Sequence, residues 1–345
     1  MSSRDEMQAT VEAIVQPGKG ILAADESSPT IAKRFASIGT ESTEANRRAW
    51  RALLLGTPGV GEFISGVILY EETLGQATDD GVPLPKLAAD LGIVPGIKVD
   101  AGKIALANAP GDEITQGLDG LGARLEGYRA QGARFAKWRA VYNVSASLPS
   151  RLAIEANADS LARYAAICQQ QGVVPIVEPE VLMDGEHSID RCAEVTEDVL
   201  HEVFHALHRH RVILELMLLK PNMVVPGKDC PEQATSEQVA ARTVEVLRRT
   251  VPAAVPGIFF LSGGQSAAEA TVNLDAMNRV GPHPWVLSFS YGRALQDPAL
   301  KAWRGQLDNA ARAQQALLWR ARLNGAARDG RYEPSMEDEF AAEAR

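Results

Sequence analysis

The sequence has few cysteines, and no motif pairs them. Cys168, Cys192 and Cys230 are the only three, and no two of them form a CxxC pair. An odd number of dispersed cysteines argues against a disulfide framework and is typical of a protein kept in a reducing compartment. We therefore interpret the three as packing residues and expect a cytoplasmic location.

A basic excess is also missing, because 35 Lys and Arg stand against 44 Asp and Glu, for a net charge of -9. Nucleic acid and anionic membranes both select clustered positive charge, so we expect neither as a partner. Residues 1–17 contain no continuous apolar core, and we expect no signal peptide or transmembrane span. An anionic small molecule fits this composition if the cations gather in one pocket.

Nucleotide-binding signatures, internal repeats and long low-complexity linkers are absent too, including the Walker A and dinucleotide patterns. What is present is a chain with 46% hydrophobic and 23% charged residues, ordinary for a protein with a large core. Eight apolar segments are expected to be strands: 21–27, 64–70, 94–99, 133–139, 173–180, 213–220, 257–264 and 285–293.

Stretches of helical periodicity separate these strands. The expected helices are 4–15, 33–55 with Thr43 as a candidate N-cap, one opening at 115–121, 150–171, 192–210, 237–250, 265–279 and 298–324. Alternating strands and helices predict parallel βα units, and eight of them predict an α/β fold of the (β/α)8 TIM barrel type. We expect one domain over residues 1–345, with a mobile tail from about residue 326.

Polar residues gather at the ends of the expected strands. Because the carboxyl ends of barrel strands meet at one face, where barrel enzymes place their catalytic groups, this clustering predicts an active site. Seven of the eight strands contribute: Asp25 and Glu26, Lys98, Lys137 and Arg139, Glu178 and Glu180, Lys220, Ser262, and Arg293.

Lys220 follows a run of large apolar residues and precedes Pro221. A buried ammonium either pairs with a carboxylate or loses its proton and becomes a nucleophile toward carbonyls. The strand alone leaves both readings open, with Glu178 as the carboxylate partner. If Lys137 lies close, it would lower the pKa of Lys220 from about 10.4 to roughly 7 to 8. Asp25 and Glu178 are then candidates for proton transfer.

Glycine-rich segments follow the last two strands, where such barrels often hold a phosphate on backbone N–H groups. These are Ser262-Gly263-Gly264 and Gly292-Arg293, and Arg293 would supply the positive charge. Ser27, Lys98 and Arg139 could hold a second anion across the mouth of the barrel. Lys98 and Arg139 could instead neutralise Asp25 and Glu178.

The segment His201-Glu202-Val203-Phe204-His205 fits the HExxH zinc pattern on an expected helix. However, the apolar residues around it form one stripe, which puts His201, His205 and His208 on the opposite side of the helix. We interpret that side as a solvated face and not as a zinc site, because a catalytic zinc also requires a third ligand and a cleft.

The segments at the strand ends closely resemble those of class I fructose-bisphosphate aldolase, in order from about Gly18 to Trp303. The matching segments are Ile21-Leu22-Ala23-Ala24-Asp25-Glu26-Ser27, Gly96-Ile97-Lys98-Val99-Asp100, Thr115-Gln116-Gly117-Leu118-Asp119-Gly120-Leu121, Phe135-Ala136-Lys137-Trp138-Arg139, Val177-Glu178-Pro179-Glu180, Leu218-Leu219-Lys220-Pro221-Asn222-Met223, Phe260-Leu261-Ser262-Gly263-Gly264-Gln265-Ser266 and Ser290-Tyr291-Gly292-Arg293-Ala294-Leu295.

This resemblance implies reversible cleavage of fructose 1,6-bisphosphate to dihydroxyacetone phosphate and glyceraldehyde 3-phosphate, in glycolysis and gluconeogenesis. It implies that Lys220 forms the Schiff base, that Glu178 is the general acid/base, that Asp25 orients or shares that proton transfer, and that Lys137 positions Glu178. It further implies no metal, no cofactor and a homotetramer.

The resemblance also assigns the two phosphates. The positions that match the 1-phosphate site are Ser262, Gly263, Gly292 and Arg293. Those that match the region of the 6-phosphate are Ser27, Lys98 and Arg139. We add Thr30, which keeps a hydroxyl in the loop where this chain reads Ser27-Ser28-Pro29-Thr30 in place of the family's Ser-Thr-Gly-Ser, and Glu180 as a supporting charge.

A second departure lies at the carboxyl end. Animal members finish on a tyrosine that folds over the site and assists proton exchange, whereas this sequence finishes on Glu343-Ala344-Arg345 and its last tyrosine is Tyr332. Two alternatives stay open. One is another Schiff-base lyase or a transaldolase on the same barrel, and the other is a noncatalytic interaction protein that retains the scaffold.

Overall fold

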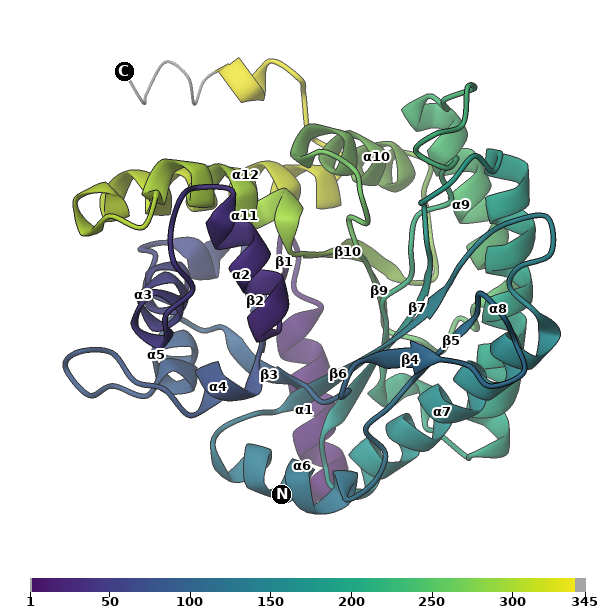
Figure 1. The fold of residues 1–345 in the computed structure, drawn as a ribbon, viewed down its shortest axis with the longest axis horizontal. Helices are drawn as coiled ribbons and strands as arrows, with labels where there is room; N and C mark the ends of the chain where they lie inside the picture. Colours follow the sequence, from purple (N-terminus) through teal and green to yellow (C-terminus); the bar gives the residue numbers. More distant parts are fainter. Residues whose placement is uncertain (1, 339–345) are drawn as a thin grey trace.

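The computed structural model describes residues 2–338, and all eight expected strands are present in them. They form a closed barrel in the order β1-β10-β9-β8-β7-β6-β3-β2, with every neighbouring pair parallel (Figure 1). The TIM barrel prediction is therefore confirmed. The strands are β1 Gly20–Ala24, β2 Ile64–Leu69, β3 Val94–Lys98, β6 Phe135–Tyr142, β7 Val174–Val181, β8 Leu218–Leu219, β9 Gly257–Phe260 and β10 Val286–Tyr291.

Helices lie around the barrel, and six of the helices begin at a Ser or Thr side chain that accepts a backbone N–H of the first turn. Thr43 is one of these caps, as predicted. The helices are α1 Ser3–Ile14, α2 Ser28–Ala36, α3 Glu44–Leu55, α4 Glu71–Leu74, α5 Leu84–Asp90, α6 Leu121–Ala130, α7 Arg151–Gln170, α8 Ile189–Arg209, α9 Ser236–Thr250, α10 Ala267–Arg279, α11 Arg293–Trp303 and α12 Ala310–Arg328.

Four predicted boundaries were wrong. The helix expected at 33–55 is two helices, α2 and α3, and the last one is divided into α11 and α12. Thr115 does not open a helix but ends β5 Glu113–Thr115, which pairs with β4 Lys103–Ala105 in a small antiparallel sheet. Most of the apolar run before Lys220 is not strand: Leu214–Leu216 form a 3-10 turn, and β8 has two residues. The apolar residues of this run therefore indicate burial and not the length of the strand.

The expected mobile tail is packed as far as the structure describes it. Residues 326–328 complete α12, and Tyr332 is only 3% exposed. The Tyr332 backbone N–H donates to Asp275, and its hydroxyl donates to Glu337 at 3.0 Å. The apolar periodicity of the sequence ends after α12 because the segment that follows has an irregular backbone, although it is still packed against the fold. Residues 339–345, which include the terminal segment, lie outside the described residues.

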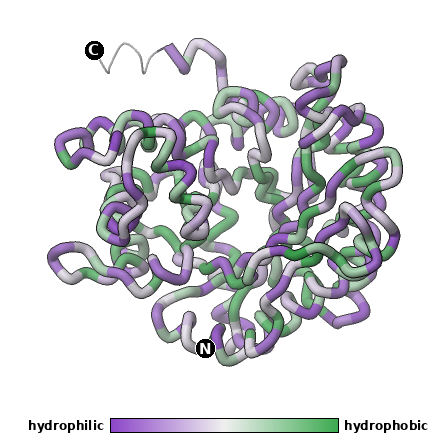
Figure 2. Tube along the Cα trace, viewed as in Figure 1, coloured by the Kyte–Doolittle hydropathy of each residue, from purple (hydrophilic) through white to green (hydrophobic). Residues whose placement is uncertain are grey.

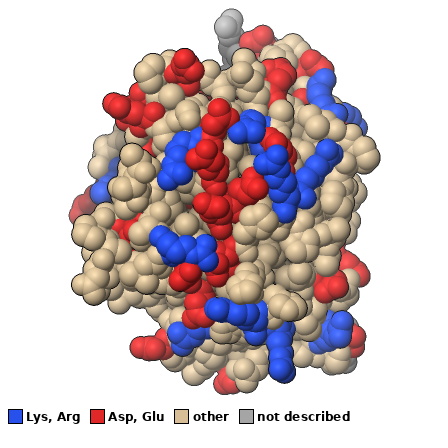
Figure 3. All heavy atoms as spheres, turned by 90° about the vertical axis from the view of Figure 1, so that its right-hand side faces the viewer, with Lys and Arg blue, Asp and Glu red and all other residues tan. Residues whose placement is uncertain are grey.

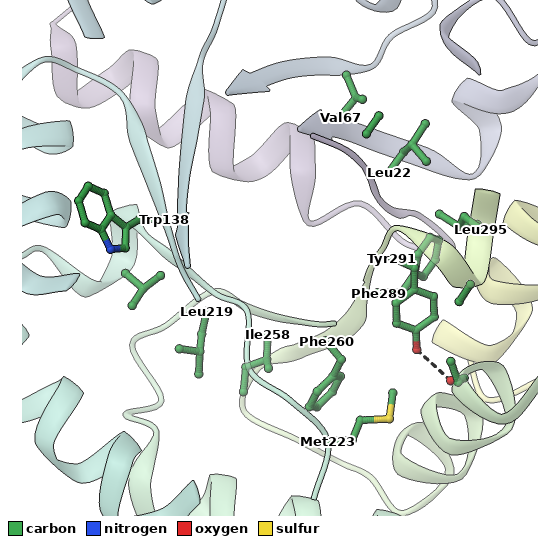
Figure 4. Packing of buried hydrophobic residues seen from close by; sticks show 14 of the residues in the cluster. Leu22, Val67, Trp138, Leu219, Met223, Ile258, Phe260, Phe289, Tyr291 and Leu295 are labelled. Carbon is green, nitrogen blue, oxygen red and sulfur yellow. Dashed lines mark hydrogen bonds between the residues drawn. The ribbon is translucent and has the colours of Figure 1, made fainter. Parts of the chain in front are cut away.

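Two apolar clusters of buried side chains hold the fold together. Figure 2 shows how hydrophobic and hydrophilic stretches alternate along the chain, with the hydrophobic ones in green. The larger cluster lies between the barrel and its helices; Leu22, Trp138 and Phe260 belong to it (Figure 4). The smaller one fills the barrel, and Met7, Val11 and Ile14 of α1 belong to it. Helix α1 therefore plugs the amino end of the barrel, which leaves the carboxyl end for the site.

Ion pairs cover the outer helices. Arg242 and Arg249 of α9 reach Asp190 and Glu197 of α8 at 2.6 and 3.1 Å. The face shown in Figure 3 accordingly carries acidic and basic side chains interspersed. No helix within residues 2–338 combines the length and the apolar character needed to cross a membrane.

Candidate active site

A pocket of about 1120 Å³ opens at the carboxyl ends of the strands. Because side chains alternate along a strand, Lys137 and Arg139 of β6 point to the same side, as do Glu178 and Glu180 of β7. All thirteen residues on which the sequence analysis based the site line this pocket: Asp25, Ser27, Thr30, Lys98, Lys137, Arg139, Glu178, Glu180, Lys220, Ser262, Gly263, Gly292 and Arg293.

Lys220 sits directly after β8, and only 4% of its side chain is exposed. Its backbone N–H donates to Val177 of β7 at 2.8 Å, and Pro221 accepts from Leu261, after β9, at 3.1 Å. These bonds continue the barrel pairing past the two residues of β8, so the position of Lys220 is set by both neighbouring strands.

Four charged groups of alternating sign lie in a row at the base of the pocket. Lys220 Nζ is 3.0 Å from Glu178 Oε1, and the other carboxylate oxygen of Glu178 is 3.0 Å from Lys137 Nζ. Lys137 Nζ is also 2.8 Å from Asp25 Oδ2. The ion pair between Lys220 and Glu178 is therefore present, and Glu178 bridges the two lysines.

Burial and charge act in opposite directions on these groups. Burial disfavours ionisation of Asp25, but the positive charges of Lys137, Lys220 and Lys98 outweigh it and hold the pKa of its carboxyl well below the ordinary value. Glu178 follows the same balance, and its pKa is also lowered. For Lys137, burial is outweighed by the surrounding carboxylates, chiefly Asp25 and Glu178, which raise its pKa. Asp25, Glu178 and Lys137 are therefore charged at neutral pH.

Lys98 and Arg139 form their direct ion pairs with other carboxylates, and their positive charges help to lower the pKa values of Asp25 and Glu178, respectively. Lys98 Nζ contacts Asp100 Oδ1 at 2.5 Å, and Arg139 forms an ion pair with Glu180. Glu180 is thus a supporting charge for Arg139, as expected.

The segments expected to bind phosphate line the pocket and come from two groups of strands. Ser262 is buried after β9, and Arg293, at the start of α11, donates to the carbonyl oxygen of Gly263. At the start of α2, which follows β1, the hydroxyl groups of the N-cap Ser27 and of Thr30 are 3.1 Å apart. The two groups of candidate anion ligands are therefore contributed by β9–β10 and by β1, β3 and β6.

Sequence reasoning missed three features of the site. Asp100 was quoted only as part of a motif, although it is the partner of Lys98. Glu26 is held by Arg34 and Arg51, which come from α2 and α3. The hydroxyl of Ser290, on β10, is buried, lines the pocket and has no hydrogen-bond partner in the described part of the chain. Only the strand-end position of Ser290 could have indicated it.

The HExxH segment lies on the outer surface of α8. His201, His205 and His208 are exposed, while Val203, Phe204 and Leu207 are buried. The predicted solvated face is confirmed. Among residues 2–338, no group of three His, Cys, Asp or Glu side chains is arranged to hold a metal ion.

The fold and the pocket define a class: a (β/α)8 barrel whose central group is a buried lysine amine in contact with carboxylates. The family described as fructose-bisphosphate aldolase class I matches residues 6–345. A relative from Xanthomonas campestris pv. campestris, a probable fructose-bisphosphate aldolase class 1, is 56% identical over 96% of this chain and 99% of its own length. The cytosolic fructose-bisphosphate aldolase 5 of Arabidopsis thaliana is also 56% identical, over 98% and 94%.

A solved structure of fructose-bisphosphate aldolase from Plasmodium falciparum, in complex with TRAP and a small molecule inhibitor, superposes with a TM-score of 0.95. It shares 52% identity and covers 96% of each chain. The chain belongs to the class I fructose-bisphosphate aldolase family. Its activity is therefore the reversible aldol cleavage of fructose bisphosphate, a carbon–carbon lyase reaction of glycolysis.

Proposed function

We propose that Lys220 forms a Schiff base with the ketone carbon of open-chain fructose 1,6-bisphosphate. The observation that carries this proposal is the contact of its Nζ with Glu178 Oε1 at 3.0 Å in a buried site. A proton passed from the ammonium to Glu178 leaves an amine that attacks the carbonyl. The carbinolamine then loses its hydroxyl group as water, for which Glu178 returns the proton.

The resulting iminium accepts the electron pair of the bond between the third and fourth carbons. As that bond breaks, a carboxylate takes the proton of the hydroxyl group on the fourth carbon, and glyceraldehyde 3-phosphate leaves. Glu178 is the general acid/base, and Asp25 orients or shares the proton transfer. Protonation of the enamine and hydrolysis of the imine then release dihydroxyacetone phosphate and free Lys220.

Lys137 is proposed to act as a fixed cation between the two carboxylates. Its raised pKa keeps it charged, so its role is to position Glu178 and Asp25 and not to transfer protons itself. Two buried carboxylates without such a cation would repel each other, and one of them would become protonated.

The phosphates are proposed to bind at the two sides of the pocket. Gly263 and Arg293, with Ser262 and Gly292, are proposed for the 1-phosphate, because they combine small residues, a hydroxyl and a guanidinium on adjacent strands. The residues proposed for the 6-phosphate are Ser27, Thr30, Lys98 and Arg139, with Glu180 orienting Arg139.

The test is chemical trapping without metal. The protein is incubated with fructose 1,6-bisphosphate in EDTA, reduced with borohydride and mapped for the added mass. A hexose or triose phosphate adduct on Lys220 is expected. Activity that needs a divalent metal, with no adduct, would contradict the Schiff-base proposal, and an adduct formed equally well with unphosphorylated sugars would favour another lyase or a transaldolase.

We further propose a metal-independent and cofactor-independent homotetramer in the cytoplasm. The name of the Arabidopsis relative supports this location, and the charge balance argues against nucleic acid and membrane partners. Sedimentation equilibrium of the full chain tests the assembly, with a mass four times 37.0 kDa expected.

A further inference from the structure

Two side chains that no family motif assigned lie against the turn Ser262–Gly264. Met183, in the loop after β7, accepts the backbone N–H of Gly264, with 2.8 Å between Sδ and N. Lys228, in the loop after β8, lies across the same glycine: a Cβ on Gly264 would meet Lys228 Cε at 2.1 Å and Nζ at 2.6 Å. Glycine at this position therefore gives the lysine side chain room to reach the turn.

The two loops hold each other in place. The backbone N–H of Lys228 donates to Met183 at 2.8 Å, and that of Asp229 donates to Gly185 at 3.0 Å. The Lys228 ammonium is 3.0 Å from Asp184 Oδ1. Because that carboxylate is 70% exposed and Lys228 itself 42%, water screens the pair, and the ammonium is free to exchange its partner for a stronger anion.

Two cations thus lie next to the turn. Arg293 donates to the carbonyl oxygen of Gly263, and Lys228 Nζ lies beside Gly264. The acceptor of the Gly264 N–H is a thioether, which is a weak acceptor compared with a phosphate oxygen. An anion at the turn can therefore replace the thioether as the acceptor of the Gly264 N–H, and it also lies near the Lys228 ammonium.

We propose that Lys228 is an additional specificity-determining residue for the phosphate bound at Ser262–Gly264, supplying a second positive charge besides that of Arg293. This inference rests on the proposed function, because it takes that phosphate to be the 1-phosphate of the substrate. In this role Lys228 binds the phosphate and takes no part in bond making or breaking, so it acts on KM and not on kcat.

Replacement of the charge alone tests the proposal. Lys228→Met keeps an apolar stem over Gly264, and we expect KM for fructose 1,6-bisphosphate to rise about 3- to 10-fold with kcat within about twofold. KM should also depend less steeply on salt than in the wild type. Fructose 1-phosphate, which carries only the 1-phosphate, should show the same rise. Lys228→Arg should restore most of the loss.

Lys86→Met is the matched control, because Lys86 also forms an exposed ion pair, with Asp90 at 2.6 Å on α5. No residue of α5 lines the pocket, whereas Lys228 lies beside Gly264, which follows the lining residues Ser262 and Gly263. Its KM should equal that of the wild type. Thermal unfolding checks that each variant folds. If Lys228→Met does not fold, Lys228→Gln replaces it, and the same rise in KM is required.

An unchanged KM in a folded Lys228 variant would overturn the proposal and leave Lys228 as a solvated partner of Asp184. A rise confined to fructose 1,6-bisphosphate would overturn it as well, because the charge would then serve the other phosphate. The proposed function fails separately: in that case the wild-type protein itself gives no borohydride adduct on Lys220.

Discussion

At the scale of single residues, the chemistry depends on an order that residue types alone do not determine. Both lysines and both carboxylates could be predicted from the strand ends, and all four line one pocket. Their sequence positions led us to expect Lys137 to act on Lys220 directly. In the structure Glu178 contacts both lysines, so a carboxylate lies between the two ammonium groups. Such an order depends on barrel register, which the sequence does not display.

Removal of the central cation should therefore change the pH dependence of catalysis. In Lys137→Met, burial of Asp25 and Glu178 is offset by fewer positive charges, so the pKa values of both carboxyls should rise. We expect kcat/KM to fall about 100-fold or more and its acid limb to move toward neutral pH. The measurement is the profile of kcat/KM against pH from about 4 to about 9. This range covers the pH values at which the acid limb is expected to move.

Lys137→Arg is the control for charge. It keeps the cation but not the geometry of the ammonium, so its rate should fall while its acid limb stays at low pH. An acid limb that does not move in Lys137→Met would contradict the role of Lys137. The same pairs contribute stability above the ordinary carboxyl pKa values, and this contribution is lost as pH falls through the lowered ones.

At the scale of elements, apolar runs predicted where strands lie but not where they stop. The run before Lys220 contains a 3-10 turn in which only Leu216 is buried, so large apolar residues alone did not distinguish turn from strand. The division of 33–55 into α2 and α3 was also missed. These two helices are joined at Glu26, where Arg34 and Arg51 contact different oxygens of one carboxylate. Gln296 of α11 donates to the same group at 2.8 Å.

This clamp should be worth more than the surface ion pairs on the same helix. Arg51→Met leaves the buried carboxylate of Glu26 without one of its two cations, so we expect the free energy of unfolding to fall by about 3 kcal/mol. Arg48→Met is the matched control on α3, because Arg48 pairs with Asp79, which is 89% exposed; its cost should stay below about 1 kcal/mol. Urea unfolding measures the free energy of unfolding of both variants. Equal decreases in the two variants would show that Arg51 is not needed to stabilise the buried carboxylate of Glu26.

At the scale of the whole molecule, the barrel could be predicted because eight strands, each followed by a helix, permit few other arrangements. The element that closes the amino end of the barrel could not be predicted. Helix α1 was expected only as a short amphipathic helix, yet its apolar face belongs to the cluster inside the barrel. The packing of Tyr332 was missed for a related reason: contacts between distant segments leave no local periodicity. The pocket and helix α1 therefore lie at opposite ends of the apolar core inside the barrel.

The plug should carry stability for the entire barrel. Ile14 is fully buried, and its carbonyl oxygen accepts the hydroxyl of Ser65 on β2 at 2.7 Å. Ile14→Ala leaves a cavity between α1 and the strands, and we expect it to lower the free energy of unfolding by about 2 to 5 kcal/mol. Leu307→Ala removes a similar amount of apolar side chain where it is 79% exposed, and its cost should stay within about 0.5 kcal/mol.

Because α1 lies at the end opposite the pocket, kcat of the folded Ile14→Ala variant should match that of the wild type at temperatures below its unfolding transition. A small loss of stability would show that α1 only covers the barrel, whereas a loss of kcat at full folding would show that the two ends are coupled.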